Sequence, residues 1–125
     1  MRVGCRARIL VRQRYKGRFR MIHDDIRTLL DSPPSGDDAP SLDHIEHTLT
    51  SGYARALALE AERLRIERRL AGVVARLTDE TTEEDASELA RLGQRLSVAD
   101  ADLTRLRSLL ASLRMRAAEV RSAAA

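Results

Sequence analysis

Two long stretches of the chain place apolar residues at alternating intervals of three and four, one within residues 41–77 and the other within residues 82–121. In an α-helix this spacing gathers the apolar side chains into one stripe, which is typical of a coiled-coil seam. The first seam consists of Leu42, Ile45, Leu49, Gly52, Ala56, Leu59, Arg63, Ile66, Leu70, Val73 and Leu77. The second consists of Leu89, Leu92, Leu96, Ala99, Leu103, Leu106, Leu110, Leu113, Ala117 and Val120. Each stretch therefore predicts one long helix.

Only residues 78–81 separate the two predicted helices. Because so short a connection brings consecutive helices back alongside each other, we predict an all-α fold. Its main part is a long antiparallel two-helix coiled-coil hairpin over residues 41–125. Hydroxyl side chains that can cap a helix stand before both stretches: Ser41 precedes the first, and Thr81 or Thr82 precedes the second.

Residues 21–40 are predicted to hold a short helix, over residues 23–31, and then a linker. The short helix places Ile26, Leu29 and Leu30 on one side. The rest of the segment contains the three prolines of the chain together with glycine and aspartates. Because proline and glycine stop helices and the polar residues remain in solvent, this part should connect rather than pack.

Residues 1–20 carry eight basic side chains and no acidic one. Because the whole chain has a formal net charge of +3, subtracting these eight leaves −5 for the remainder. We predict a disordered basic arm, whose charge would suit nucleic acid or an anionic surface. A second interpretation is that the arm is translated from a misplaced start codon and that the natural chain begins at Met21. Cys5, the single cysteine, lies in this arm and is given no redox or catalytic role.

Charged residues flank the two seams at positions that face each other in an antiparallel pair. When each seam is written as heptads abcdefg from its first leucine, position e includes acids in the first helix and arginines in the second. Antiparallel helices bring e against e. We therefore predict ion pairs between Glu60 and Arg107 and between Glu46 and Arg121.

One charged residue lies inside the first seam. Arg63 occupies a heptad a position, where an unpaired buried cation would destabilise the fold. We predict that Glu67 or Asp100 pairs with it while its long stem packs along the seam. A polar residue at such a position often sets the register of the helices or the choice of partner.

Several large apolar residues lie away from the seams. Leu57, Leu64 and Leu109, together with Val74, widen the apolar surface beyond what two helices cover for each other. Three arrangements would cover them: self-association into a four-helix bundle, docking of the short helix, or a separate protein partner. We expect these leucines and Arg63 to form the partner surface.

The sequence offers little for catalysis. It contains no glycine-rich phosphate loop, no nucleophile elbow and no His-Glu-x-x-His motif. His44 and His47 are three residues apart, but no third metal ligand converges on them, and one cysteine excludes a cysteine-based zinc site. No apolar run approaches the roughly 20 residues that span a bilayer. The ratio of 21 arginines to one lysine is typical of a GC-rich bacterial gene. We therefore predict a cytoplasmic bacterial non-enzyme without catalytic residues, metal or cofactor.

Residues 100–110, Asp-Ala-Asp-Leu-Thr-Arg-Leu-Arg-Ser-Leu-Leu, resemble the second helix of RsiG-type anti-sigma factors of actinobacteria. That family is a helical hairpin whose helices carry the pattern E-x3-S-x2-R-x3-Q-x3-D, which holds a dimer of cyclic di-GMP while the protein grips a flagellar-type sigma factor. Asp100 stands at the Glu position, Thr104 at the Ser position, and Arg107 matches the Arg.

The resemblance implies that cyclic di-GMP is a ligand contacted by Asp100, Thr104 and Arg107, and that a sigma factor is the partner. Ala111 and Met115 replace the Gln and Asp of the pattern, and the first helix carries no copy of it. Protein binding is therefore expected ahead of nucleotide binding.

Together these observations predict a protein-binding coiled-coil regulator. Two alternatives stay open at this point. The first is a self-assembling structural or adaptor hairpin, a homodimer with no small ligand. The second is nucleic-acid binding through the basic arm, which the negative charge of the remainder disfavours.

Overall fold

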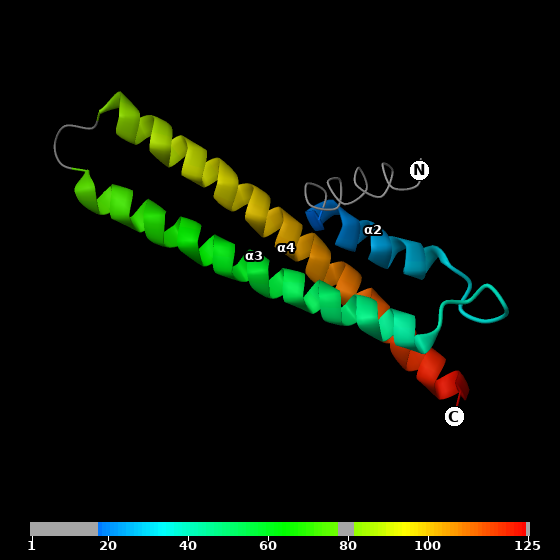
Figure 1. Ribbon diagram of the computed structural model, residues 1–125. Coiled ribbons are helices and arrows are strands. Elements are labelled where there is room, and N and C mark those ends of the chain that lie inside the picture. Colours follow the sequence, from blue (N-terminus) through cyan, green and yellow to red (C-terminus); the bar gives the residue numbers. More distant parts are fainter. Residues whose placement is uncertain (1–17, 78–81, 125) are drawn as a thin grey trace, which may run out of the picture. The chain divides into compact units, whose positions relative to one another are not determined.

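The computed structural model describes residues 18–77 and 82–124, and the secondary structure of this part of the chain is entirely α-helical. It contains α2 (Arg18–Asp31), α3 (Leu42–Arg76) and α4 (Glu83–Ala124), shown in Figure 1. The prediction of an all-α fold is confirmed. None of the described helices is long and apolar enough to cross a membrane.

The helix preceding the linker is longer than expected. It begins at Arg18, so the expected start at His23 is wrong, and the expected arm over residues 1–20 overlaps the helix by three residues. The reason is Ile22, which is 8% exposed and extends the buried stripe of Ile26 and Leu29 by one turn toward the N-terminus. Residues 1–17, and with them most of the predicted arm, lie outside the described residues.

The starts of the two long helices follow the expected caps. The backbone N–H of His44 donates to Oγ of Ser41 at 3.1 Å, and the N–H of Asp85 donates to Oγ1 of Thr82 at the same distance. Each hydroxyl thus satisfies an amide that has no partner within its helix. Thr82 is therefore the cap of α4. The predicted connection over residues 78–81 lies outside the described residues.

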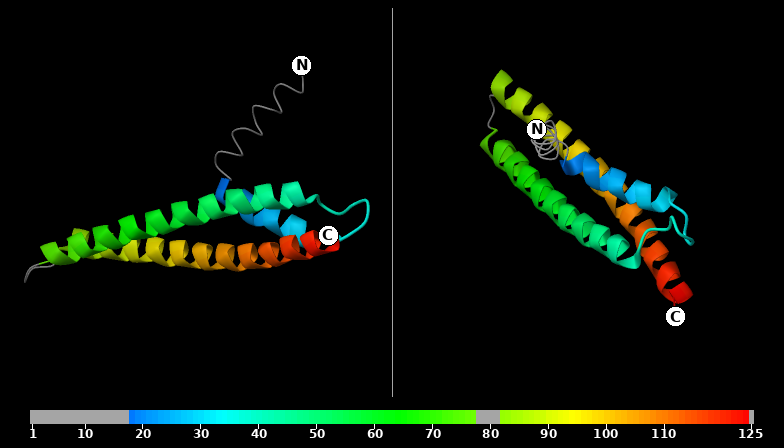
Figure 2. Two further views of the ribbon diagram at one scale, coloured as in Figure 1. Left: turned by 90° about the horizontal axis from the view of Figure 1, so that it is seen from below. Right: turned by 45° about the vertical axis from the view of Figure 1, so that its right-hand side comes forward.

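The chain divides into two compact units, to both of which α3 and α4 contribute. Unit 1 comprises Met1–Arg55 and Ser108–Ala125, and unit 2 comprises Ala56–Arg107. In unit 1, α2 lies alongside the first turns of α3 and the last turns of α4 (Figure 2). Its buried apolar residues come from all three helices: Ile22, Ile26, Leu29, Ile45, Leu49, Leu110, Leu113 and Ala117.

Arg116 joins α4 to the end of α2 in unit 1. Its Nη2 donates to the carbonyl oxygen of Leu30 at 3.0 Å, and its Nη1 donates to that of Ser32 at 3.1 Å. The side chain is only 19% exposed. Because the last carbonyls of a helix lack partners within it and carry partial negative charge, a guanidinium is well suited to this position.

Unit 2 contains two helical segments, one from α3 and one from α4. Their paired residues run in opposite order, since Glu60 contacts Arg107 while Arg69 contacts Glu88. The segments of this unit are therefore antiparallel. Seam residues that are at most 5% exposed form its core: Leu59, Ile66, Val73, Leu92, Ala99, Leu103 and Leu106.

Glycines in the helices differ sharply in the space around them, and this difference predicts opposite mutational effects. A Cβ on Gly52 would overlap the side chain of Leu110 and lie 3.6 Å from Cδ1 of Ile26, whereas one on Gly72 or Gly93 would meet nothing within 4 Å. Gly52→Val should lower the free energy of unfolding by about 2 kcal/mol, the usual cost of overpacking. Gly72→Ala should raise it by about 0.5–1 kcal/mol, because alanine favours helix. Urea denaturation followed by circular dichroism measures both, and a stabilising Gly52→Val would contradict the packing described.

Candidate protein-interaction surfaces

Exposed apolar side chains gather on the α3 segment of unit 2. Leu57 is 67% exposed, Leu64 is 46% exposed and Val74 is 55% exposed. The two leucines are seven residues apart and so lie on the same row of the helix, with Val74 on the adjacent row. We call these three residues the leucine flank. Two of the predicted partner-surface leucines are therefore exposed together.

Leu109 does not belong to this flank. It is half-buried, and it lies in unit 1, seven residues before Arg116 on the row of α4 that carries the contact with α2. Its membership of the partner surface expected for Leu57, Leu64 and Arg63 stays a prediction. Docking of the short helix was one of the three ways expected to cover the extra apolar residues, and in unit 1 α2 does pack against the long helices.

Ion pairs connect the two segments of unit 2 beside the leucine flank. Nη1 of Arg63 lies 3.3 Å from Oδ1 of Asp100, and its Nε lies 3.8 Å from Oε1 of Glu67. The side chain of Arg63 is 34% exposed, so its stem packs in the seam while its charge stays near water and two acids. Both predicted partners of Arg63 are confirmed. The charge of Arg63 is therefore neither fully buried nor unpaired, and the destabilisation expected of an unpaired buried cation does not arise.

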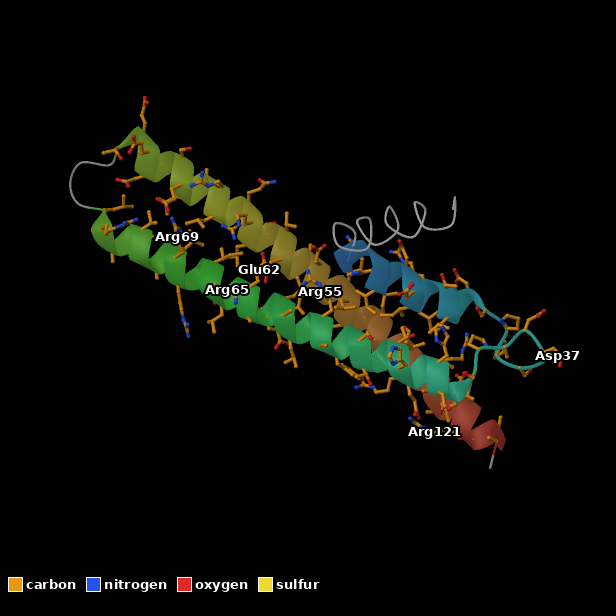
Figure 3. All side chains as sticks on the ribbon, in the orientation of Figure 1. Asp37, Arg55, Glu62, Arg65, Arg69 and Arg121 are labelled. Carbon is orange, nitrogen blue, oxygen red and sulfur yellow. The ribbon has the colours of Figure 1, made fainter. Side chains whose placement is uncertain are left out.

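The predicted ion pairs between e positions also form. Arg107 contacts Glu60 in unit 2. In unit 1, Nη2 of Arg121 lies 2.6 Å from Oε1 of Glu46 (Figure 3 labels Arg121). All four side chains are more than one third exposed to solvent, so each pair contributes roughly 0–1 kcal/mol to stability and acts mainly on register.

Asp100, Thr104 and Arg107, the residues to which the sequence resemblance assigns cyclic di-GMP, are all exposed on α4. Two of the three already have partners on α3, since Asp100 pairs with Arg63 and Arg107 pairs with Glu60. A nucleotide that contacts Asp100 and Arg107 would compete with their α3 partners, Arg63 and Glu60.

Sequence reasoning missed a basic groove in unit 2. It has a volume of about 360 Å³ and lies between the segments of α3 and α4. We call it the arginine groove, and its lining consists of Glu62, Arg65, Ile66, Arg69, Arg91, Leu92 and Arg95. Figure 3 shows the α3 side chains Glu62, Arg65 and Arg69 on successive turns. The available signal was a repeated pair of arginines four residues apart, Arg65 with Arg69 and Arg91 with Arg95.

Positive charge in the groove is only partly neutralised. Nη2 of Arg69 lies 3.0 Å from Oε1 of Glu88, to which Arg76 also comes within 3.8 Å. Arg65, Arg91 and Arg95 are exposed and make no ion pair with any residue in the described parts of the chain. The groove lining therefore combines three arginines without ion pairs with two buried apolar residues, Ile66 at 2% and Leu92 at 1% exposure, which form its floor.

Comparison with known proteins adds no relative. No protein-family model, curated protein or solved structure was found to match the chain.

Proposed function

We propose that this chain is a non-enzymatic protein-binding regulator in which α3 and α4 form one long antiparallel coiled-coil hairpin. The proposal of a single hairpin rests on the alternation of three and four, which continues without a slip through each long helix. Antiparallel ion pairs inside unit 2 and the hydroxyl caps at both helix starts support it.

The leucine flank is the observation that carries the proposal of protein binding. Leu57 keeps most of its surface in water, and Leu64 keeps nearly half. The buried core of unit 2 is formed without either of them. Covering such a side chain contributes about 1.5–3 kcal/mol relative to leaving it exposed. A row of leucines at heptad spacing is the pattern that one further helix can cover.

A different protein fits this flank better than a second copy of the chain. A two-fold contact centred between Leu57 and Leu64 would place Glu60 of one copy next to Glu60 of the other. Each Glu60 also pairs with Arg107 of its own chain, so the repulsion between the two carboxylates opposes association only weakly. Self-assembly is therefore the outcome against which the proposal is tested.

A narrower form of the proposal follows from the sequence resemblance alone: the partner is a sigma factor, and cyclic di-GMP adjusts its binding through Asp100, Thr104 and Arg107. Their exposure on α4 leaves them accessible to a ligand. Nucleic-acid binding through residues 1–17 concerns a segment outside the described residues, and we do not propose it.

The experiment compares the wild-type chain with Leu57→Glu/Leu64→Glu. Its matched control is Gln94→Glu/Ala101→Glu, which adds the same charge to exposed positions on the α4 segment of unit 2, away from the leucine flank. Sedimentation velocity gives the oligomeric state of each purified protein. Each protein is then immobilised and exposed to lysate of the source organism, with and without added cyclic di-GMP, and retained proteins are quantified by mass spectrometry.

We expect a monomeric wild type that retains a specific protein, with retention falling about tenfold or more in the leucine variant and less than twofold in the control. A stable dimer that the leucine variant dissociates would overturn the proposal in favour of self-assembly. A retained sigma factor whose amount responds to cyclic di-GMP would support the narrower form, and an unchanged amount would count against nucleotide sensing.

A further inference from the structure

We infer that the arginine groove of unit 2 binds an acidic amphipathic helix of a partner protein. The inference rests on the proposed function of protein binding and specifies the chemistry of the partner. It concerns a surface different from the leucine flank, so the two can be tested separately.

In unit 1, the row of α4 that corresponds to Arg95 of the groove is covered by another helix. Arg116 lies 21 residues after Arg95, which is three heptads and therefore the same row of α4. In unit 1 that row carries a third helix, because Arg116 donates hydrogen bonds to Leu30 and Ser32 at the end of α2. In unit 2 the same row of α4 contributes Arg95 to the lining of the groove. A helix is thus the element that this pattern of rows accommodates.

Charge decides the nature of that helix. Arg65, Arg91 and Arg95 have no acidic partner among the described residues, and a guanidinium binds a carboxylate through two parallel hydrogen bonds. The arginines on each side are four residues apart, about one helical turn. Acidic residues spaced by three or four on a docking helix have the same repeat. Its apolar side would face Ile66 and Leu92 on the floor of the groove.

Other anionic and helical occupants fit less well. Nucleic-acid affinity depends on a continuous basic track that neutralises many phosphates. In the described part of unit 2, however, acidic side chains are as numerous as basic ones, and Glu83, Glu84 and Asp85 begin α4. The segment 1–17 of this chain is basic and would be repelled by the groove. The favoured occupant is therefore a short acidic protein segment.

The test uses a synthetic probe, a fluorescein-labelled 21-residue alanine-based helix with glutamates four apart on both sides of a leucine stripe. A second peptide has glutamine at every glutamate position. Fluorescence anisotropy measures binding to the full chain, to Arg65→Gln/Arg95→Gln, and to Arg68→Gln/Arg105→Gln. The last variant removes the same charge from exposed arginines of unit 2 outside the groove lining. Circular dichroism checks that each variant keeps its helix content.

The wild type should bind the acidic peptide and not the glutamine peptide, more weakly as salt increases. The groove variant should bind about tenfold or more weakly, and the control within about twofold. Equal binding of the two peptides, equal losses in the two variants, or no binding by the wild type would overturn the inference. So would groove-dependent binding of a 20-base-pair DNA duplex in preference to the peptide, or a dimer of the chain that only the groove variant dissociates.

Failure of the groove does not imply failure of protein binding. Capture of the cellular partner by Arg65→Gln/Arg95→Gln at wild-type level, with loss only in the leucine variant, would overturn the groove inference and leave the proposed function in place. Loss of capture in neither variant would count against both surfaces.

Discussion

Replacement of Leu106 by alanine is expected to lower the free energy of unfolding by about 3 kcal/mol. Leu106 is 0% exposed in unit 2, where its side chain belongs to the seam between the α3 and α4 segments. Truncation removes buried methyl groups and leaves a cavity that two helices with few large neighbours close only in part. Urea denaturation monitored by circular dichroism measures the change.

Leu57→Ala is the matched control, since it makes the same chemical change on the same unit. Leu57 is 67% exposed, and we expect the free energy of unfolding to change by less than about 0.5 kcal/mol. Similar losses in both variants would contradict the assignment of Leu106 to the core and Leu57 to the surface. In the free protein, the effect of Leu57 on stability should thus be small even where its effect on partner binding is large.

Replacement of Arg116 by methionine should have the second large effect, a loss of about 2–3 kcal/mol from the stability of unit 1. Methionine keeps much of the stem but leaves the carbonyl oxygens of Leu30 and Ser32 without their charged donor. Hydrogen exchange measured by mass spectrometry should become faster over residues 22–31.

Arg114→Met is the control for charge removal at the same end of α4, because Arg114 is exposed. It should leave exchange over residues 22–31 unchanged. Equal acceleration in both variants would indicate that net charge, rather than the two hydrogen bonds of Arg116, holds the end of α2.

Much of the helical structure could be predicted because it depends on local order along the chain. The caps at Ser41 and Thr82 and the pairing of Glu60 with Arg107 follow from positions within one turn or from heptad arithmetic. The contact of Arg116 with α2 could not be predicted, because its acceptors are backbone carbonyls 84 and 86 positions away in sequence. Backbone acceptors leave no pattern of residue types.

The arginine groove was missed for a different reason. Arginines outside the seams look like a solvent-exposed coat when each helix is considered alone, and i,i+4 pairs are frequent in such coats. Only the antiparallel register of unit 2 brings Arg65 and Arg69 opposite Arg91 and Arg95. The start of α2 was missed because the eight basic residues of segment 1–20 indicated a disordered arm up to Arg20. Ile22, which is buried in the core, lies two residues beyond the end of that segment.

The short linker between α2 and α3 makes α2 an intramolecular ligand of unit 1. Only residues 32–41 separate the two helices, so the tethered helix is present at an effective concentration on the order of millimolar. A free helix that binds the same rows of unit 1 with equal affinity would have to reach a similar concentration to displace α2. Few cellular proteins reach millimolar concentration. The tether therefore gives unit 1 its own resident helix and leaves recognition of external helices to surfaces that have no tethered competitor.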